Sequence, residues 1–199
     1  MGTYEYHVFK QLQIKLLLQG LYSGSGLMLP AQSATGNQFA AGTADVVSVS
    51  LHEAANFSTT VFTQNNVPIA LNGQLQVNVP DMYSGTYYLH LKHRNSIGVV
   101  SALPVSMAGN PIIYDFTDAA SKAFGNNQLD VDGFFALYGG DANQDGSVDA
   151  LDLIAIDNAS NSFATGYFGF DVNGDGAADA LDLILTDNNA LGFVQEITP

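Results

Sequence analysis

The sequence has 199 residues, 47% of them hydrophobic and only 12% charged, and its 19 acidic and 5 basic side chains give a formal net charge of -14. Binding to phosphate requires a basic face, so this charge balance argues against nucleic acids and anionic membrane surfaces as partners. The chain has no cysteine, which excludes disulfides, zinc–thiolate sites and cysteine nucleophiles. No apolar run is long enough to predict a membrane span.

The first 124 residues read as a series of short β-strands. Residues 10–22 alternate apolar and polar side chains, which is typical of a half-buried strand, and a long Gly/Ser-rich loop follows at 23–42. Further strands separated by turn signals are predicted at 44–53, 57–63, 74–79, 86–92, 98–102, 103–107 and 112–116. Many short strands at close spacing predict an antiparallel β-sandwich of the immunoglobulin-like or prealbumin-like kind.

The tripeptide His93-Arg94-Asn95 ends one of these strands. A catalytic role would require a nucleophile or carboxylate partner, and no spacing in the sequence supplies one. We expect Arg94 to pair with an acid or with loop carbonyls. A structural role is favoured over contact with a ligand, and catalysis is least favoured.

A domain boundary is predicted at Gly125-Asn126-Asn127, after one helical turn at 118–124. It divides the chain into a β-sandwich domain, 1–124, and a second module, 125–199. Aromatic residues flank the acidic loops of the second module: Phe134, Phe135, Tyr138, Tyr167, Phe168 and Phe170. We expect them to pack the small module against the sandwich, and the alternative is an exposed docking patch.

One twelve-residue acidic pattern occurs twice in the second module, as DANQDGSVDALD at 141–152 and DVNGDGAADALD at 171–182. Both copies carry oxygen-bearing side chains at positions 1, 3, 5, 9 and 12 and glycine at position 6, which is the layout of an EF-hand calcium loop. Calcium takes six to eight oxygen ligands, so a loop that wraps it needs closely spaced carboxylates. We therefore predict two Ca²⁺ ions.

The predicted ligands of the first loop, with position 7 contributing its backbone carbonyl, are Asp141, Asn143, Asp145, Ser147, Asp149 and Asp152. Those of the second loop are Asp171, Asn173, Asp175, Ala177, Asp179 and Asp182. Position 12 is Asp in place of the bidentate Glu of sensor loops. The alternative is a pair of Asp/Asn/Gly turns without metal. The repeat disfavours it, because Leu153, Ile154 and Phe163 recur 30 residues later as Leu183, Ile184 and Phe193.

At these residues the sequence resembles a dockerin, a calcium-loop module that bacteria append to secreted proteins. The resemblance covers about 60 residues and rests on the paired loops, on Asp at position 12 and on DALDLI at 149–154 and 179–184. It implies two loop-plus-exiting-helix halves, because Tyr138-Gly139-Gly140 and Phe168-Gly169-Phe170 before the loops are not helical sequences. In dockerins positions 10 and 11 help to choose the partner, and here both copies have Ala-Leu there, at 150–151 and 180–181.

Segments such as YYLHLKHRNSIGVVSA and FFALYGGDANQDG resemble a C-terminal region of large secreted and surface proteins of Bacteroidota, in which a β-sandwich with an HRN-type motif precedes a dockerin-like segment. The resemblance implies an extracellular or cell-surface location. Residues 1–3 do not look like a signal peptide. We therefore expect this sequence to be part of a longer secreted protein.

The function expected first is that of a non-catalytic calcium-binding module for structural support, anchoring or attachment, not an enzyme. The alternatives are a dockerin that binds a cohesin-type partner, or a carbohydrate-binding sandwich appended to an enzyme. Sugar platforms usually contain Trp, which is absent here, so Tyr83, Tyr87 and Tyr88 would have to substitute. No nucleophile elbow, phosphate loop or zinc motif is found.

Overall fold

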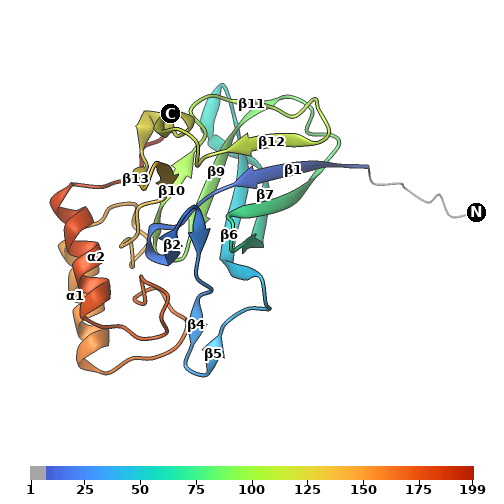
Figure 1. Ribbon diagram of the computed structural model, residues 1–199. Helices are drawn as coiled ribbons and strands as arrows, with labels where there is room; N and C mark the ends of the chain where they lie inside the picture. The colour runs from blue at the N-terminus through green and yellow to red at the C-terminus, as the bar shows by residue number, and fades with distance from the viewer. Residues whose placement is uncertain (1–7) are drawn as a thin grey trace, which may run out of the picture.

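The computed structural model describes residues 8–199, so the prediction about residues 1–3 lies outside it. Two β-sheets form the body of the molecule (Figure 1). One sheet has three strands in the order β12-β1-β8, with bounds Ile112–Asp115, Phe9–Lys15 and Gln74–Pro80. The other has the order β10-β9-β6-β7, with β11 also paired to β9, and its bounds are Ser96–Val100, Thr86–His93, Thr43–Glu53, Asn56–Ala70 and Val105–Ser106.

The two sheets share one hydrophobic core. Alternate residues of β1 and β8, such as Leu12 and Val77, are fully buried with Val49 and Leu91 of the opposite sheet. The intervening residues of β1 and β8 are exposed or half-buried. The period-2 pattern of the sequence therefore identified the buried face of these strands correctly.

The expectation of a wholly antiparallel sandwich was wrong for one pair of strands. β1 and β12 run parallel, with Leu12 opposite Ile112 and Lys15 opposite Asp115, while the other paired strands of the two sheets are antiparallel. Hydrophobic alternation is the same in both kinds of pairing, because it depends only on which face is buried.

The segments between the strands are more ordered than predicted. Residues 23–42, expected to be a loop, contain small hairpins, and the turn expected at 118–124 becomes two 3₁₀ turns. The short elements are η1 Gln19–Leu21, β2 Tyr22–Gly24, β3 Leu27–Met28, β4 Gln32–Ser33, β5 Gly36–Asn37, η2 Ala120–Lys122, η3 Phe124–Asn126, β13 Leu129–Val131 and β14 Phe134–Ala136.

The acidic loops are each followed by a helix, α1 Ala150–Asn161 and α2 Ala180–Leu191. In the described part of the chain no helix leads directly into either loop at 138–140 or 168–170, as the resemblance implied. The two helices lie side by side at one end of the molecule (Figure 1). Ala142 and Val172 of the two loops and Ile156 of α1 are buried together in a small hydrophobic cluster of their own.

The two halves of this helical segment are interlocked. The chain after α1 returns to the second loop, where the amide of Ala178 donates to the carbonyl of Ala164 (3.0 Å). The chain after α2 returns to the first loop, where Val148 donates to Val194 (2.8 Å). Each loop is therefore fixed by the segment that follows the other loop's helix.

The division at residues 124 and 125 stays a prediction. Ala136 and Leu137, beyond the predicted boundary, are buried in the core cluster of the sandwich. No helix among residues 8–199 is long and apolar enough to cross a membrane.

Candidate metal centre

The last carboxylate of each acidic loop closes the loop on itself. Oδ1 of Asp152 accepts the amides of Ala142 (2.9 Å) and Asn143 (3.1 Å), and its Oδ2 accepts the amide of Asp149 (2.9 Å). Asp182 accepts from the equivalent amides at 2.7, 2.9 and 2.9 Å. Both carboxylates are fully buried, so position 12 holds the loop backbone through these three bonds.

The carboxylate at position 9 begins the helix. Asp149 accepts the amide of Leu151 (2.7 Å) and forms a capping box with Asp152, and Asp179 does the same with Leu181 and Asp182. The pattern DALDLI therefore serves as a helix start in both copies. A calcium ligand at position 9 often acts through water, which is compatible with this capping role.

Positions 3 and 5 form a pair of side-chain turns. The amide oxygen of Asn143 accepts from the Asp145 amide (2.8 Å), and Oδ1 of Asp145 accepts from the Ser147 amide (3.0 Å). Asn173, Asp175 and Ala177 repeat both bonds at 2.8 and 3.0 Å. Position 7 is held by isolated β-bridges, Ser147 to Gln195 and Ala177 to Thr165.

Position 1 has an oxygen that the protein does not satisfy. Asp141 and Asp171 each accept the position-6 glycine amide on Oδ2 at 3.2 Å, and both glycines, Gly146 and Gly176, have φ of 89°. Oδ1 of both carboxylates is buried without a hydrogen-bond partner. A buried carboxylate oxygen without a partner is costly, so these two oxygens fit a site for a positive group.

Electrostatics at position 1 lead to the same conclusion. Burial, and then the charge of Asp152, raise the pKa of Asp141 to about 6. Burial also raises the pKa of Asp171 to about 6, although Arg94 opposes the shift. A divalent cation at these oxygens would offset both burial and carboxylate repulsion.

The donor set fits a hard cation such as calcium. Among the described residues, no three His, Cys, Asp or Glu side chains group closely enough to hold a metal by themselves. A calcium ion would therefore need the mixed set of carboxylate, amide and backbone oxygens that each loop supplies, and oxygen-only coordination of this kind is what calcium prefers. The individual ligands and the number of ions remain predictions.

The sandwich and the second loop meet at a buried charged cluster. Asp45 of β6 is fully buried, with His93 Nε2 3.1 Å and Arg94 Nε 3.3 Å from its Oδ2, and the Tyr167 hydroxyl donates to its Oδ1 (2.5 Å). Burial alone would raise the pKa of Asp45, but His93, Arg94 and Tyr167 together lower it to about 2. Burial lowers the pKa of His93 in turn, so Arg94 supplies the positive charge at neutral pH.

Arg94 extends from this cluster to the second loop. Its Nη1 donates to the carbonyls of Phe168 and Asp171, the latter at 2.7 Å, and its guanidinium lies over the Tyr167 ring at 4.5 Å. Asn95 Nδ2 donates to the same Asp171 carbonyl (2.7 Å). The expectation that Arg94 pairs with an acid or with loop carbonyls is confirmed, because it does both. The Tyr167 contacts also confirm, for this residue, that a flanking aromatic joins the module to the sandwich.

The comparisons with known proteins agree with this geometry. Residues 139–191 match the dockerin type I domain. The matched segment, called the dockerin segment below, contains both loops and both helices. No curated protein matches the chain.

The fold of the whole chain resembles solved cohesin–dockerin structures. A chain from the type II cohesin–X–dockerin complex of Acetivibrio cellulolyticus with a mutant C-terminal interface superposes with a TM-score of 0.51 and 16% identity, over 90% of this chain and 94% of that chain. The N-terminal interface mutant of that complex gives 0.50 and 17% over the same shares. At these identities the likeness concerns the fold alone.

The dockerin segment exposes large apolar side chains in matched pairs. Leu151 and Leu181 are 59% and 58% exposed, Ile154 and Ile184 are both 58% exposed, and Phe163 and Phe193 are both 88% exposed. The leucine at position 11 of each loop could pack inward or face a partner. Leu151 and Leu181 face solvent.

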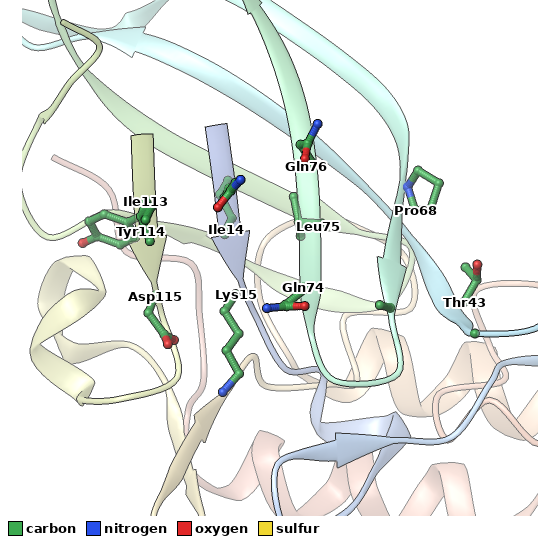
Figure 2. Close-up of a pocket in the computed structure, with 13 residues that line it drawn as sticks. Ile14, Lys15, Thr43, Pro68, Gln74, Leu75, Gln76, Ile113, Tyr114 and Asp115 are labelled. Carbon is green, nitrogen blue, oxygen red and sulfur yellow. The ribbon is translucent and has the colours of Figure 1, made fainter. Parts of the chain in front are cut away.

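A groove of about 500 Å³ lies on the sandwich, over the outer face of β12, β1 and β8 and the start of β6 (Figure 2). Gln13 of β1 pairs in register with Gln76 of β8 on one side and with Ile113 of β12, which is 70% exposed, on the other. The tyrosines proposed as a sugar platform do not line it. Tyr83 and Tyr87 meet edge to face at 86° and pack against the core.

Proposed function

We propose that this chain is a non-catalytic, calcium-binding attachment module of a larger secreted or cell-surface bacterial protein, and that its dockerin segment binds a cohesin-type partner. The match of residues 139–191 to the dockerin type I domain supports the attachment role. Calcium binding and an extracellular setting are inferred from the acidic loops, since weak calcium sites fill where calcium is millimolar.

The observation that carries the partner proposal is the duplicated apolar surface. Helices α1 and α2 present the same side chains, Leu151 with Ile154 and Leu181 with Ile184, at nearly equal exposure. Apolar surface rimmed by polar residues is typical of protein interfaces, and a repeated one offers two equivalent docking faces.

The two phenylalanines strengthen the argument because they are exposed and strained. Phe163 and Phe193 follow the helix ends with φ of 54° and 53°, a left-handed conformation that favours glycine. Ala164 and Val194, next along the chain, donate back to Ala159 and Asn189, which is a helix C-terminal motif normally completed by glycine. A large apolar side chain kept at such a position indicates contact with a partner.

The non-catalytic part of the proposal is supported by where the reactive groups lie. His93 and Asp45 form an imidazole–carboxylate pair of the type that hydrolases use, but they are 6% and 0% exposed. Their other contacts are structural, with His93 Nδ1 3.0 Å from the Ser96 hydroxyl and Asp45 bound by Arg94 and Tyr167. Burial and these structural contacts favour a structural role for the pair.

The test is direct binding to a panel of purified type I and type II cohesin modules, measured by calorimetry with calcium and with chelator. The variants are Ile154→Asp, Ile184→Asp and the double variant, with Ile113→Asp on the sandwich as a matched exposed control. We expect each single variant to retain binding through the other face, the double variant to lose it, and Ile113→Asp to bind like the unmodified chain. Binding unaffected by the double variant would place the interface elsewhere, and no binding to any module would refute the cohesin partner.

A carbohydrate ligand for the sandwich is the second candidate, and the groove in Figure 2 is the observation that favours it. Amide side chains both donate and accept hydrogen bonds, as sugar hydroxyls require, and Gln13, Gln74 and Gln76 supply them on neighbouring strands. Affinity electrophoresis in gels that contain soluble polysaccharides tests this role. Retardation by a polysaccharide that is abolished in Gln13→Ala/Gln76→Ala would support it, and equal mobility in every gel would reject it.

A further inference from the structure

The two calcium loops are nearly identical in local geometry but differ in what surrounds them. The paired bonds from Ala142 and Val172 to position 12, and from Gly146 and Gly176 to position 1, differ by at most 0.2 Å. From their local geometry alone, the two loops should be equally stable in the absence of calcium and equally stable in its presence. Any difference must come from the rest of the chain.

The sandwich holds the second loop directly. Asp171, at position 1, has its carbonyl bound by both Arg94 and Asn95, and the Arg94 Nη2 atom lies 3.9 Å from its Oδ2. The amide of Gln32 donates to the carbonyl of Gly174 (2.8 Å), further along the same loop. Asp171, Gly174 and Gly176 are all buried.

The helix that follows the second loop is held in the same way. Asn189 of α2 donates to the side chain of Gln19 and to the carbonyl of Gly139, both at 2.7 Å. The equivalent position in α1 is Ala159, which has no side-chain donor. Loop two and its helix are thus anchored to the sandwich at several points.

The first loop has a different arrangement. Near the sandwich, the Gln144 side chain donates to the Arg94 carbonyl (2.6 Å) and the Gly140 amide donates to the Asn95 carbonyl (2.8 Å). The C-terminal tail also holds this loop: Val148 donates to Val194 (2.8 Å), Ser147 bridges Gln195, and the Glu196 amide donates to Gly146 (2.7 Å). Within residues 8–199, no Lys, Arg or His forms an ion pair with Asp141, Asp145, Asp149 or Asp152. Its carboxylates therefore repel one another without a cation from the protein.

We infer that Arg94, assisted by Asn95, is a positioning residue that supplies the second loop with a resident positive charge and a backbone clamp, so that this loop stays folded without calcium while the first loop depends on the ion. Arg94 acts through the Asp171 carbonyl and is not itself a calcium ligand. The inference rests on the proposed calcium sites for the role of the ion in loop one. The role of Arg94 in loop two can be tested with no ion and no partner present.

The test is amide hydrogen exchange by NMR on the full chain, in chelator and in calcium. The duplicated sequence provides matched reporters, Ala142 with Val172 and Gly146 with Gly176, which donate equivalent bonds in the two loops. In chelator, we expect the first-loop amides to exchange faster than their partners by about tenfold or more, since a hydrogen bond to a charged group is worth at least that factor. This difference in exchange rate between the two loops in chelator is called the gap below. In calcium it should narrow, because calcium protects the first-loop amides from exchange.

Arg94→Gln should remove the gap in chelator by accelerating Val172 and Gly176, and Asn95→Ala should narrow it without changing any charge. Lys10→Met is the matched control: Lys10 is also buried and also reaches carbonyls, those of Asp81 and Tyr83, but it lies in the sandwich away from the loops. It should leave the gap intact. Amides of the buried strand residues Val49 and Leu91, followed in the same spectra, show whether each variant keeps the sandwich folded.

Equal exchange of the two loops in chelator would overturn the inference, and so would a gap that survives Arg94→Gln. If Arg94→Gln unfolds the sandwich, Asn95→Ala decides by the same criterion. If the unmodified chain bound no cohesin but showed the gap in chelator, and Arg94→Gln removed that gap, the cohesin partner would be rejected and the inference supported. A gap that closes in Arg94→Gln but does not respond to calcium would support the Arg94 role and contradict calcium binding.

Discussion

The hydroxyl of Tyr167 donates a 2.5 Å hydrogen bond to the buried carboxylate of Asp45, which lies 122 residues earlier in the chain. Asp45 belongs to β6, and Tyr167 lies between α1 and the second acidic loop. This bond therefore ties the dockerin segment to the centre of the larger sheet.

Replacing Tyr167 by Phe removes only this hydroxyl, and the ring keeps its contacts with Arg94 and Phe39. We expect the free energy of unfolding to fall by about 1.5–3 kcal/mol, the usual value of a hydrogen bond to a charged group. Tyr22→Phe is the control, because the Tyr22 hydroxyl accepts only a long bond from the neutral Gly26 amide (3.3 Å). Urea unfolding of both variants measures the difference, and equal losses would show that the bond to Asp45 has no special weight.

The lowered pKa of Asp45 predicts that its contribution to the free energy of unfolding decreases at acidic pH. Because the pKa of Asp45 is lowered to about 2 in the folded protein, its stabilising effect is complete above the unfolded value of 3.8 and is lost as the pH falls towards about 2. The difference in unfolding free energy between the unmodified protein and Asp45→Asn should therefore shrink over this window, by at most about 1.4 kcal/mol per pH unit. Urea titrations from pH 5 to about pH 2 follow this difference.

Asp118→Asn provides the comparison for the acid prediction, since Asp118 is half-exposed and pairs with Lys122 at the surface. Its effect on the free energy of unfolding should be small, because exposed ion pairs contribute little. A constant difference for Asp45→Asn across the same range would show that Asp45 is not held ionised by its partners.

The loops and helix starts could be predicted from the sequence because their interactions are local. Asp149, Leu151 and Asp152 lie within four residues, so the capping box is visible in DALDLI itself. The buried charged cluster could not be predicted in the same way. Arg94 meets Asp45 across 49 residues and Asp171 across 77, and the sequence shows only that an arginine needs a partner.

The prediction of strand pairing was limited for a similar reason, because pairing joins residues that lie far apart in the sequence. Burial alternates along β1 and β8, which the sequence showed, but the position of β12 beside β1 depends on how the chain returns across the sandwich. Strands of two residues, such as β4 and β5, are too short to show any period. Their place is set by long-range contacts such as Gln32 to Gly174.

Asp152, at position 12 of the first loop, combines the role of a backbone acceptor with that of a predicted calcium ligand, and variants of this residue can separate the two. Asp152 binds three backbone amides and is also a predicted calcium ligand. Asp152→Asn keeps one acceptor oxygen for Ala142 and Asn143, but it loses the charge and the acceptor for the Asp149 amide. We expect calcium affinity to fall on the order of tenfold or more and the metal-free fold to weaken less than in Asp152→Ala. Asp152→Ala should lose both, because three amides lose their acceptor.

Calcium titration by calorimetry and helical circular dichroism in chelator distinguish these outcomes for Asp152. Asp182→Asn is the internal comparison in the second loop, with the same three bonds. If Asp152→Asn bound calcium as tightly as the unmodified chain, position 12 would be a structural cap and not a ligand.

The phenylalanines after the helices predict a conflict between stability and binding. Phe163 has φ of 54° and is 88% exposed, so its side chain contributes little packing while its backbone is strained. Phe163→Gly should therefore raise the free energy of unfolding by about 1 kcal/mol, and Phe193→Gly should do the same. Ala at these positions removes the ring but keeps the strain, so Phe163→Ala should leave stability nearly unchanged. If the rings contact a partner, the double variants Phe163→Gly/Phe193→Gly and Phe163→Ala/Phe193→Ala should weaken cohesin binding to the same degree despite their different stabilities, while a single variant keeps the other face intact. Thermal unfolding of the single variants and calorimetric binding of the two double variants measure the two effects separately, and a double glycine variant that gained stability with undiminished binding would remove these phenylalanines from the proposed interface.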